Sequence, residues 1–390
     1  MADRFFVGNS GNWNDTTHWS LTSGGTSGAA VPGTADDVYF DANSFSLASQ
    51  TVTMSKAYPC SLSCKNINWT GVSGTPTWYF DVNSVTGLYK EIDLDIYGDA
   101  TCVGSMVVSA TEGPLYSEGP LINFSYNGNQ TFNPAGLDFG LTYFFFWSSG
   151  TKNLAGDLGM SQGVAWEDRT SPSGDGTQVF NTNGYDMTSI FYDIYCNNGG
   201  AEHPNSIVIN MGSSNIYIGT TAYTNWGAYW DLQNSSNSEI ITLNAQNSNL
   251  IINDGNGGPY ISDAFGNQYN KITVNGFGTA GGPSWIFNGG NGYPGTPTIN
   301  QLILKPDSYL QFTPFDTTEV PEWQYYYNIG TLTANGNAYQ RITIDTETSG
   351  SPALVNAGTT SLSFVTPTNI FNSSVLPASC TAERICTTSS

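Results

Sequence analysis

The residues most capable of chemistry lie in the stretch KEIDLDIYGD, where Glu91, Asp93 and Asp95 alternate with apolar residues. Alternation places the three carboxylates on one face of a strand, with neighbours about 7 Å apart. Paired carboxylates at such distances carry out glycoside hydrolysis. The same pattern is also typical of a strand with one solvated face and one buried face. We favour the solvated face, so we predict no catalytic residues and no enzymatic activity.

A second acidic group, Asp36, Asp37 and Asp41, offers the hard oxygen ligands that calcium prefers. Aspartates also stabilise turns by accepting hydrogen bonds from nearby backbone amides. The segments GDGT at 174–177 and NDGNGG at 253–258 are similar, and neither belongs to a regular nonapeptide series of calcium-binding repeats. We interpret all of these as turns and predict no metal site.

Nucleophilic and zinc chemistry have little support in this chain. The two histidines, His18 and His203, lie in polar surroundings without a recognisable serine or cysteine partner. Cys60 and Cys64 resemble half of a zinc site, but no second half follows. Glycine-rich loops followed by Lys-Ser or Lys-Thr are absent too. We therefore predict no cofactor.

Aromatic residues gather in YTNWGAYWDL, which contains Tyr223, Trp226, Tyr229 and Trp230 among Gly, Asn and Thr. This composition is typical of a surface that stacks against carbohydrate or adheres to a partner. The same rings could instead pack inside the protein or form a subunit contact. EWQYYYN at 322–328 is a second cluster of this kind.

The elements that must position these residues are short strands. The 390 residues include 44 Gly and 18 Pro, too many for long helices, and aromatic residues make up 13%. Runs of Val, Ile, Thr, Tyr and Phe end repeatedly in Asn, Gly, Ser or Asp, which is typical of strands joined by tight turns. The sequence therefore predicts an all-β protein.

The amount and distribution of charge restrict the kinds of molecule that this protein can bind. Lys and Arg number 10 against 31 Asp and Glu, a net charge of -21, and the basic residues are spread singly along the chain. No basic patch could neutralise a row of phosphates, so we expect no nucleic-acid partner. No apolar stretch has the length of a signal peptide or of a membrane span, so we expect no membrane association.

Pairs of short strands around sharp polar corners, as in SIVINMGSSNIYIG at 206–219 and EIITLNAQNSNLIIND at 239–254, favour a right-handed parallel β-solenoid. The alternative is a multidomain protein rich in β-sandwiches or jelly rolls. We predict an N-terminal cap and first strand over residues 1–50, a solenoid body over 51–370, and a C-terminal tail over 371–390. Cys380 and Cys386 could join in a disulfide that staples the tail.

The stretch GNSGNWNDTTHWSLTSGGTSGAAVPGTADDVYFDANSF, at residues 8–45, resembles the start of phage particle-associated β-helix proteins. It has a Gly-Asn-Trp, a second Trp, a Gly-rich loop, a proline and an Asp-Asp-Val-x-Phe-Asp strand. A looser similarity connects it with autotransporter-type β-helix adhesins.

The resemblance implies a structural protein of the bacteriophage virion, most naturally a tail fibre, spike or host-recognition component. Its partners would be other virion proteins, further copies of the chain in a homotrimer, and a glycan of the host surface. The alternatives are a head decoration protein, a polysaccharide depolymerase of the tailspike kind, and a secreted β-helix adhesin.

The two tryptophans of GNWNDTTHWS fit either a lid or a sugar-stacking platform. The first coil of a solenoid leaves an apolar cross-section and unpaired backbone groups that must be covered. We predict that Trp13, Trp19 and Asp37 form a structural cap and that both indole rings are buried.

Overall fold

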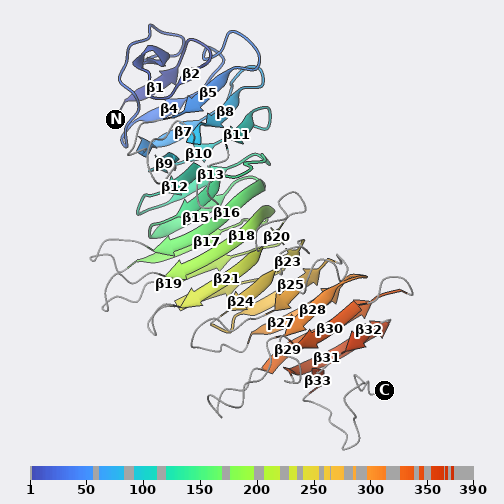
Figure 1. Ribbon diagram of the computed structural model, residues 1–390. Helices are drawn as coiled ribbons and strands as arrows, with labels where there is room; N and C mark the ends of the chain where they lie inside the picture. The colour runs from blue at the N-terminus through green and yellow to red at the C-terminus, as the bar shows by residue number, and fades with distance from the viewer. Residues whose placement is uncertain are drawn as a thin grey trace, which may run out of the picture. The chain divides into compact units, whose positions relative to one another are not determined.

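The computed structural model describes most of the chain (Figure 1). The described residues are 2–55, 61–82, 92–111, 120–168, 176–196, 206–219, 228–234, 240–253, 259–263, 265–275, 284–286, 297–312, 326–337, 342–346, 353–363, 365–367 and 370–372. Within these ranges the protein is all-β, as predicted, and its helical structure is limited to short 3₁₀ turns such as Thr16–His18.

The chain divides into two compact units, described separately below. Unit 1 comprises Met1–Thr188 with Asn197–Asn205, and unit 2 comprises Ser189–Cys196 with Ser206–Ser390.

Unit 1 contains the strands up to β17, which follow one another in short steps. They are β1 (Asp3–Phe6), β2 (Gly11–Asn12), β3 (Trp19–Ser20), β4 (Asp37–Tyr39), β5 (Thr51–Met54), β6 (Ser61–Cys64), β7 (Asn66–Asn68), β8 (Thr77–Phe80), β9 (Ile92–Ile96), β10 (Ala100–Thr101), β11 (Val107–Ala110), β12 (Pro120–Phe124), β13 (Gln130–Asn133), β14 (Tyr143–Phe146), β15 (Gly150–Leu154), β16 (Leu158–Asp168) and β17 (Thr177–Asn181).

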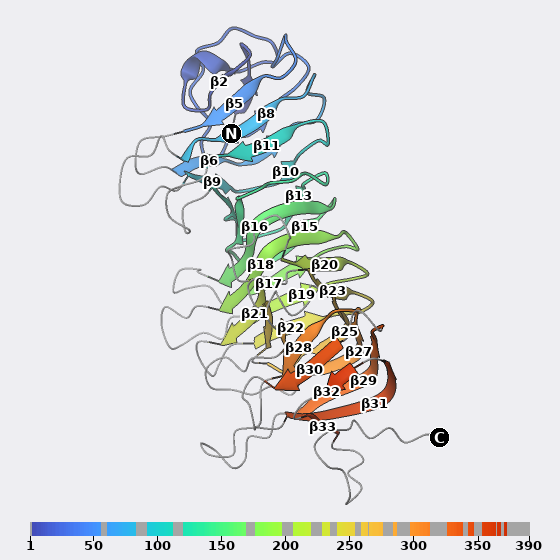
Figure 2. The same cartoon turned by 45° about the vertical axis from the view of Figure 1, so that its right-hand side comes forward.

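These strands pair in parallel into three columns, which Figure 2 shows from a second side. The columns are β4–β7–β10–β13–β15–β17, β2–β5–β8–β11 and β6–β9–β12–β14–β16. Within these columns each described strand pairs with the strand of the next turn of chain rather than with its neighbour in sequence. The exception outside the columns is β3, which pairs antiparallel with β1. This arrangement is compatible with a β-solenoid, whereas sandwiches and jelly rolls pair antiparallel strands.

The interior of unit 1 is filled by aromatic rings that stack from one turn to the next. Phe40 lies flat on Trp69 with ring centroids 3.7 Å apart, and Phe124 stacks on Phe146 at 5.0 Å. Parallel strands in register bring equivalent positions of successive turns next to each other, so the aromatic rings of one turn contact those of the next.

Long polar side chains close the corners of unit 1 from inside. Gln130 donates to the carbonyls of Ile96 and Gly98, both at 2.9 Å, and Gln178 donates to those of Phe146 and Ser148. Such buried carbonyls would otherwise lack partners and cost stability.

Lys152, on β15 between the strands of Gln130 and Gln178, also bonds to backbone carbonyls at a corner. Its ammonium donates to the carbonyls of Tyr126 at 2.6 Å and Gly128 at 3.0 Å. Burial lowers the pKa of Lys152 to about 8.

Unit 2 begins within β18 and contains the remaining strands. They are β18 (Met187–Cys196), β19 (Ser206–Asn210), β20 (Asn215–Ile218), β21 (Tyr229–Asn234), β22 (Ile240–Asn244), β23 (Asn249–Ile252), β24 (Tyr260–Asp263), β25 (Gln268–Val274), β26 (Ser284–Ile286), β27 (Thr298–Leu304), β28 (Tyr309–Phe312), β29 (Tyr326–Asn335), β30 (Ile342–Thr346), β31 (Ala353–Ser363), β32 (Val365–Pro367) and β33 (Ile370–Asn372).

Its strands also pair in parallel with the next turn of chain, as in β18–β21–β24–β26–β28–β30–β32. Polar ladders mark the corners, where Asn244 donates to Asn210 at 2.7 Å and Asn249 lies 3.5 Å from Asn215. The Asn residues that end the strand runs in the sequence therefore bond to their equivalents in the adjacent turn. The segment after Asn372, with Cys380 and Cys386, lies outside the described residues.

Candidate functional site

The carboxylates of β9 lie where the sequence places them. Asp93 and Asp95 are half-buried and point outward, while the intervening Ile and Leu side chains are fully buried. Asp95 accepts hydrogen bonds from Asn123 at 3.0 Å and Ser125 at 3.4 Å. The predicted alternation is confirmed for β9, and Glu91 lies outside the described residues.

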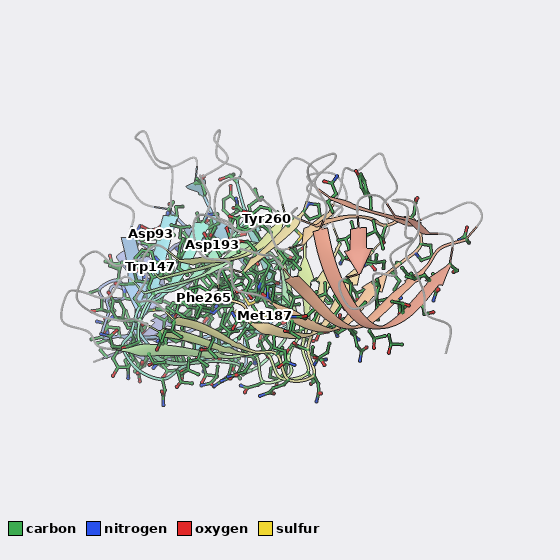
Figure 3. All side chains as sticks on the ribbon, turned by 90° about the horizontal axis from the view of Figure 1, so that it is seen from below. Asp93, Trp147, Met187, Asp193, Tyr260 and Phe265 are labelled. Carbon is green, nitrogen blue, oxygen red and sulfur yellow. The ribbon has the colours of Figure 1, made fainter. Side chains whose placement is uncertain are left out.

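The strands beside β9 bring aromatic rings to the same outer face. Asp93 is in register with Leu121 of β12 and, one turn further, with Tyr143 of β14. On β14 and the residue after it, Tyr143, Phe145 and Trp147 are half-buried and face outward, while the phenylalanines between them are buried. Figure 3 labels Asp93 and Trp147.

The three rings form one continuous strip along the strand. Tyr143 and Phe145 stack with centroids 4.4 Å apart, and Trp147 meets Phe145 edge to face at 5.3 Å. Beyond the strip, β16 offers only Gly163 and Ala165 in register with the first two rings. The sequence analysis missed this site because YFFFW is a continuous aromatic run. Its alternation was the available signal, since a strand turns every second ring outward.

In unit 2 the predicted aromatic cluster is divided by the strand. Trp230 is 1% exposed and packs inside against Tyr192 at 5.4 Å, so its prediction as a ligand-binding residue is wrong. Adjacent residues of a strand point to opposite faces, and Tyr229 is accordingly half-buried and turned outward. Tyr223 and Trp226 lie outside the described residues, as does most of the 322–328 cluster.

Tyr229 belongs to a stacked ladder on the outer face of unit 2. Its ring lies 5.0 Å from Phe191 of β18 and 5.2 Å from Tyr260 of β24, nearly parallel to both. The central ring is thus covered on both faces by its neighbours, which leaves it no face for a sugar ring. The ladder therefore serves the packing of adjacent turns.

Two carboxylates stand beside this ladder, because Asp193 is in register with Asp231. The Tyr260 hydroxyl lies 3.4 Å from Asp231 Oδ2. Burial raises the pKa of Tyr229 and Tyr260 well above that of a free tyrosine, and the nearby carboxylates add to the effect. Both phenols remain protonated donors at neutral pH. Figure 3 labels Asp193 and Tyr260.

Asp263, at the end of β24, organises a turn. It accepts hydrogen bonds from the backbone amides of Phe265 at 2.8 Å and Asn267 at 3.0 Å, and from the Tyr269 hydroxyl at 2.9 Å. Burial raises its pKa, against the effect of these donors. The role of this carboxylate is therefore structural.

The acidic group near the N-terminus consists of turn and pairing residues. Asp36 accepts from the amides of Ala2 at 3.1 Å and Gly33 at 3.2 Å, and Asp41 accepts from the amide of Asn43 at 2.9 Å. The turn interpretation is thus confirmed for these two carboxylates. Within the described ranges, no group of three or more His, Cys, Asp or Glu could hold a metal ion.

Asp37 differs, since its carboxylate joins successive turns of chain. It accepts from Asn66 Nδ2 at 2.6 Å and lies 3.9 Å from the ammonium of Lys65. Both partners lie next to or on β7, which pairs with β4. Asp37 therefore helps to fix β4 to β7, the strand of the next turn.

The two N-terminal tryptophans are inside the protein. Trp13 is 1% and Trp19 0% exposed, and the Trp19 indole N–H donates to the carbonyl of Trp13 at 2.7 Å. Their rings meet edge to face at 5.0 Å, and Trp19 also packs against Phe6 and Phe40. Buried rings have no face for a ligand, so the sugar-platform alternative is wrong.

His18 and the described cysteines are packing residues. His18 Nδ1 lies 3.0 Å from the carbonyl of Val7, and the ring stacks on Phe6. Cys64 and Cys102 are buried free thiols, and burial raises the pKa of Cys102 to about 12. Such thiols are unreactive at neutral pH. His203 and Cys60 lie outside the described residues.

Comparisons with models of known protein families, with curated proteins and with solved structures find no match to this chain. Among the described residues no helix is long and apolar enough to cross a membrane.

Proposed function

We propose that this chain is a structural protein of a bacteriophage particle, a right-handed β-solenoid that serves as a tail fibre, spike or host-recognition component. The main support for a solenoid is that, in both units, strands pair in parallel with the strand of the next turn of chain. Interlocked turns with stacked aromatic interiors make a stiff element, which suits a protein that spaces or presents other parts of a particle. The phage origin comes from the motif at residues 8–45.

The N-terminal end of unit 1 supports the proposed cap. β3 pairs antiparallel with β1, and the Trp19 carbonyl on its other side accepts from the amides of Gly28 and Ala29, both at 3.0 Å. The backbone groups that an open first coil would leave unpaired are thereby partly satisfied, and the two indoles cover the apolar cross-section. A covered end prevents further strand addition there.

The proposal includes no catalysis. Several described carboxylates that could in principle act in catalysis form structural hydrogen bonds instead. Asp36 and Asp263 bond to backbone amides, and Asp37 bonds to Asn66 in the next turn of chain. These three carboxylates therefore serve as hydrogen-bond acceptors that hold the fold.

Location on a particle can be tested with an antibody against the purified chain. We expect the chain to band with density-gradient-purified particles in fixed stoichiometry, and gold labelling or a cryo-EM map to place it on the tail. Labelling of the head would support the decoration protein instead. Recovery from the cell-surface fraction without particles would contradict the proposal and favour an adhesin.

A further inference from the structure

One outer face of unit 2 carries lysine, amide and hydroxyl groups in a chain whose net charge is -21. It is formed by the segments QLILK, TLTAN and TTSLS, at 301–305, 331–335 and 359–363, which contain no Asp or Glu. These segments lie in or directly after β27, β29 and β31, so this surface is here called the β27–β31 face. We propose that it binds an acidic polysaccharide. The inference does not depend on a phage particle, because it rests on side chains of the chain itself.

The strands hold the outward side chains of this face in rows. Gln301 of β27 is in register with Thr331 of β29, which is in register with Thr359 of β31. Lys271 of β25 continues the row on the other side of Gln301. Figure 2 shows β25, β27, β29 and β31 as successive strands. Since adjacent strands lie about 4.8 Å apart, a linear ligand that crosses them meets one polar side chain at each strand.

The side chains of this row are open to solvent. Gln301 and Thr359 are exposed, as are Lys305 and Ser361, while Lys271 and Thr331 are half-buried. The apolar residues between them, such as Leu302 and Leu332, are buried. Among the described residues, the side chains of Gln301, Thr331 and Thr359 have no hydrogen-bond partner. Their donors and acceptors are therefore available to a ligand.

The two lysines supply positive charge that is not neutralised by a neighbouring carboxylate. Ion pairs in the described ranges are formed by Arg4 and Lys65 of unit 1, whereas Lys271 and Lys305 have no ion-pair or hydrogen-bond partner there. Lys271 is in register with Gln301, and Lys305 lies four residues further along, so the two lysines are separated by about 13 Å along the strands. A polymer with repeated carboxylates can bind both ammonium groups at once, whereas a small anion reaches only one.

The negative charge of unit 2 lies largely in another column of strands. Asp193, Asp231 and Asp263 are on β18, β21 and β24, which pair with one another and not with β27. The carboxylate next to the face in sequence is Asp307, which is half-buried in the turn after Lys305. At physiological ionic strength, exposed charges more than about 8 Å apart are largely screened. The lysines therefore dominate the interaction with an anion at the face itself.

The same face lacks the features that bind peptides or nucleic acids. β27 pairs with both β25 and β29, and β29 with both β27 and β31, so neither strand offers a free edge to an extended peptide. The apolar side chain at the outward positions of the three segments is Ile303, which is half-buried and forms no groove for a helix. Two lysines do not neutralise a row of phosphates. Hydroxyl and amide groups both donate and accept hydrogen bonds, which suits the hydroxyls of sugars.

Calorimetry on the full purified chain in 0.15 M salt tests this. The acidic probes are oligogalacturonate, oligomers of alginate and hyaluronate, and oligosialic acid, and the neutral probes are oligomers of glucose and N-acetylglucosamine. We expect saturable binding of at least one acidic probe and much weaker binding of its monomer. Lys305→Gln should weaken it about tenfold, as the loss of one charge-assisted hydrogen bond does, and Lys271→Gln should weaken it too. Lys305→Arg, which keeps the charge, should retain most of the affinity.

Lys65→Gln is the matched control, because it changes the net charge by the same amount at a lysine of unit 1. Its affinity should equal that of the unchanged protein, and circular dichroism should confirm that every variant is folded. Absence of binding to every acidic probe would overturn the inference. Equal binding of a neutral probe, or binding that survives in the folded variant with both Lys271→Gln and Lys305→Gln, would overturn it as well.

Other polyanions and a second copy of the chain are the competing occupants. If polyglutamate or duplex DNA binds as tightly as the best acidic polysaccharide, the face does not select a saccharide and the inference is wrong. It is also wrong if Lys305→Gln changes the sedimentation coefficient while no polysaccharide binds, since the face is then a contact between copies. Particle association is measured separately, so a negative result there leaves the binding result unaffected.

Discussion

At the scale of single residues, the packing of His18 depends on a glycine. A Cβ built on Gly11 would lie 2.1 Å from His18 Nε2, far inside contact distance. The His18 ring is held by Phe6 and by the Val7 carbonyl, so it has little freedom to move. The backbone of Gly11 is not in the left-handed region, so sterics alone decide the effect of a side chain here.

We expect Gly11→Ala to lower the free energy of unfolding by about 1–3 kcal/mol, as overpacking does. Urea denaturation would measure the loss. Gly104→Ala is the control, because its Cβ would meet nothing closer than the Ala135 carbonyl at 3.7 Å. Adding His18→Ala to Gly11→Ala should recover part of the loss. If Gly11→Ala and Gly104→Ala prove equally stable, the His18 ring moves aside for the new methyl group, and the prediction is wrong.

Lys152 makes the stability of unit 1 depend on pH. Its pKa in the folded protein is about 8, against 10.5 for the free side chain, so the unfolded chain binds more protons between these values. The contribution of Lys152 to stability therefore rises as pH increases from 8 towards 10. Buried tyrosines and thiols with raised pKa act in the opposite direction at the upper end of this range.

The comparison of the unchanged protein with Lys152→Met isolates this contribution. We expect the difference in urea midpoint between the two to grow between pH 8 and pH 10 in favour of Lys152. Lys152→Met should also lower stability throughout, since it leaves the carbonyls of Tyr126 and Gly128 without their donor. A difference that stays constant with pH would contradict a lowered pKa.

At the scale of elements, we propose that β3 and the two tryptophans close the N-terminal end of the strand stack. Trp19→Ala removes a fully buried ring that packs on Trp13, Phe6 and Phe40, so we expect a loss of about 3–5 kcal/mol. Leu21→Ala, at a side chain 60% exposed just after β3, is the control and should cost little. Thermal denaturation would compare them. A loss from Trp19→Ala no larger than the control would contradict the cap.

At the scale of the whole molecule, we predict a homotrimer, which rests on the resemblance to β-helix tail proteins. A solenoid grows by adding strands, so an end without a cap must meet another chain or a separate cap. Sedimentation equilibrium at micromolar concentration should give three times the chain mass of 41.8 kDa. A stable monomer over the whole concentration range would contradict the prediction.

The sequence alone determined the secondary structure class and much of the local detail. Gly and Pro exclude long helices, and the alternation in IDLDI fixes which side chains of β9 face inward. Short-range rules also identified Asp36 and Asp41 as turn residues, because an aspartate bonds to the backbone within a few residues of itself. The burial of Trp13 and Trp19 followed from the cost of exposing two indoles.

Only the tertiary structure decided which residues share a face. Trp230 and Tyr229 are neighbours in sequence, yet the strand sends one into the core and the other to the surface. Tyr143 and Asp93 are far apart in sequence, and the parallel register of β9, β12 and β14 places them on one surface. Register depends on pairing between turns of chain, a long-range contact that no local pattern encodes.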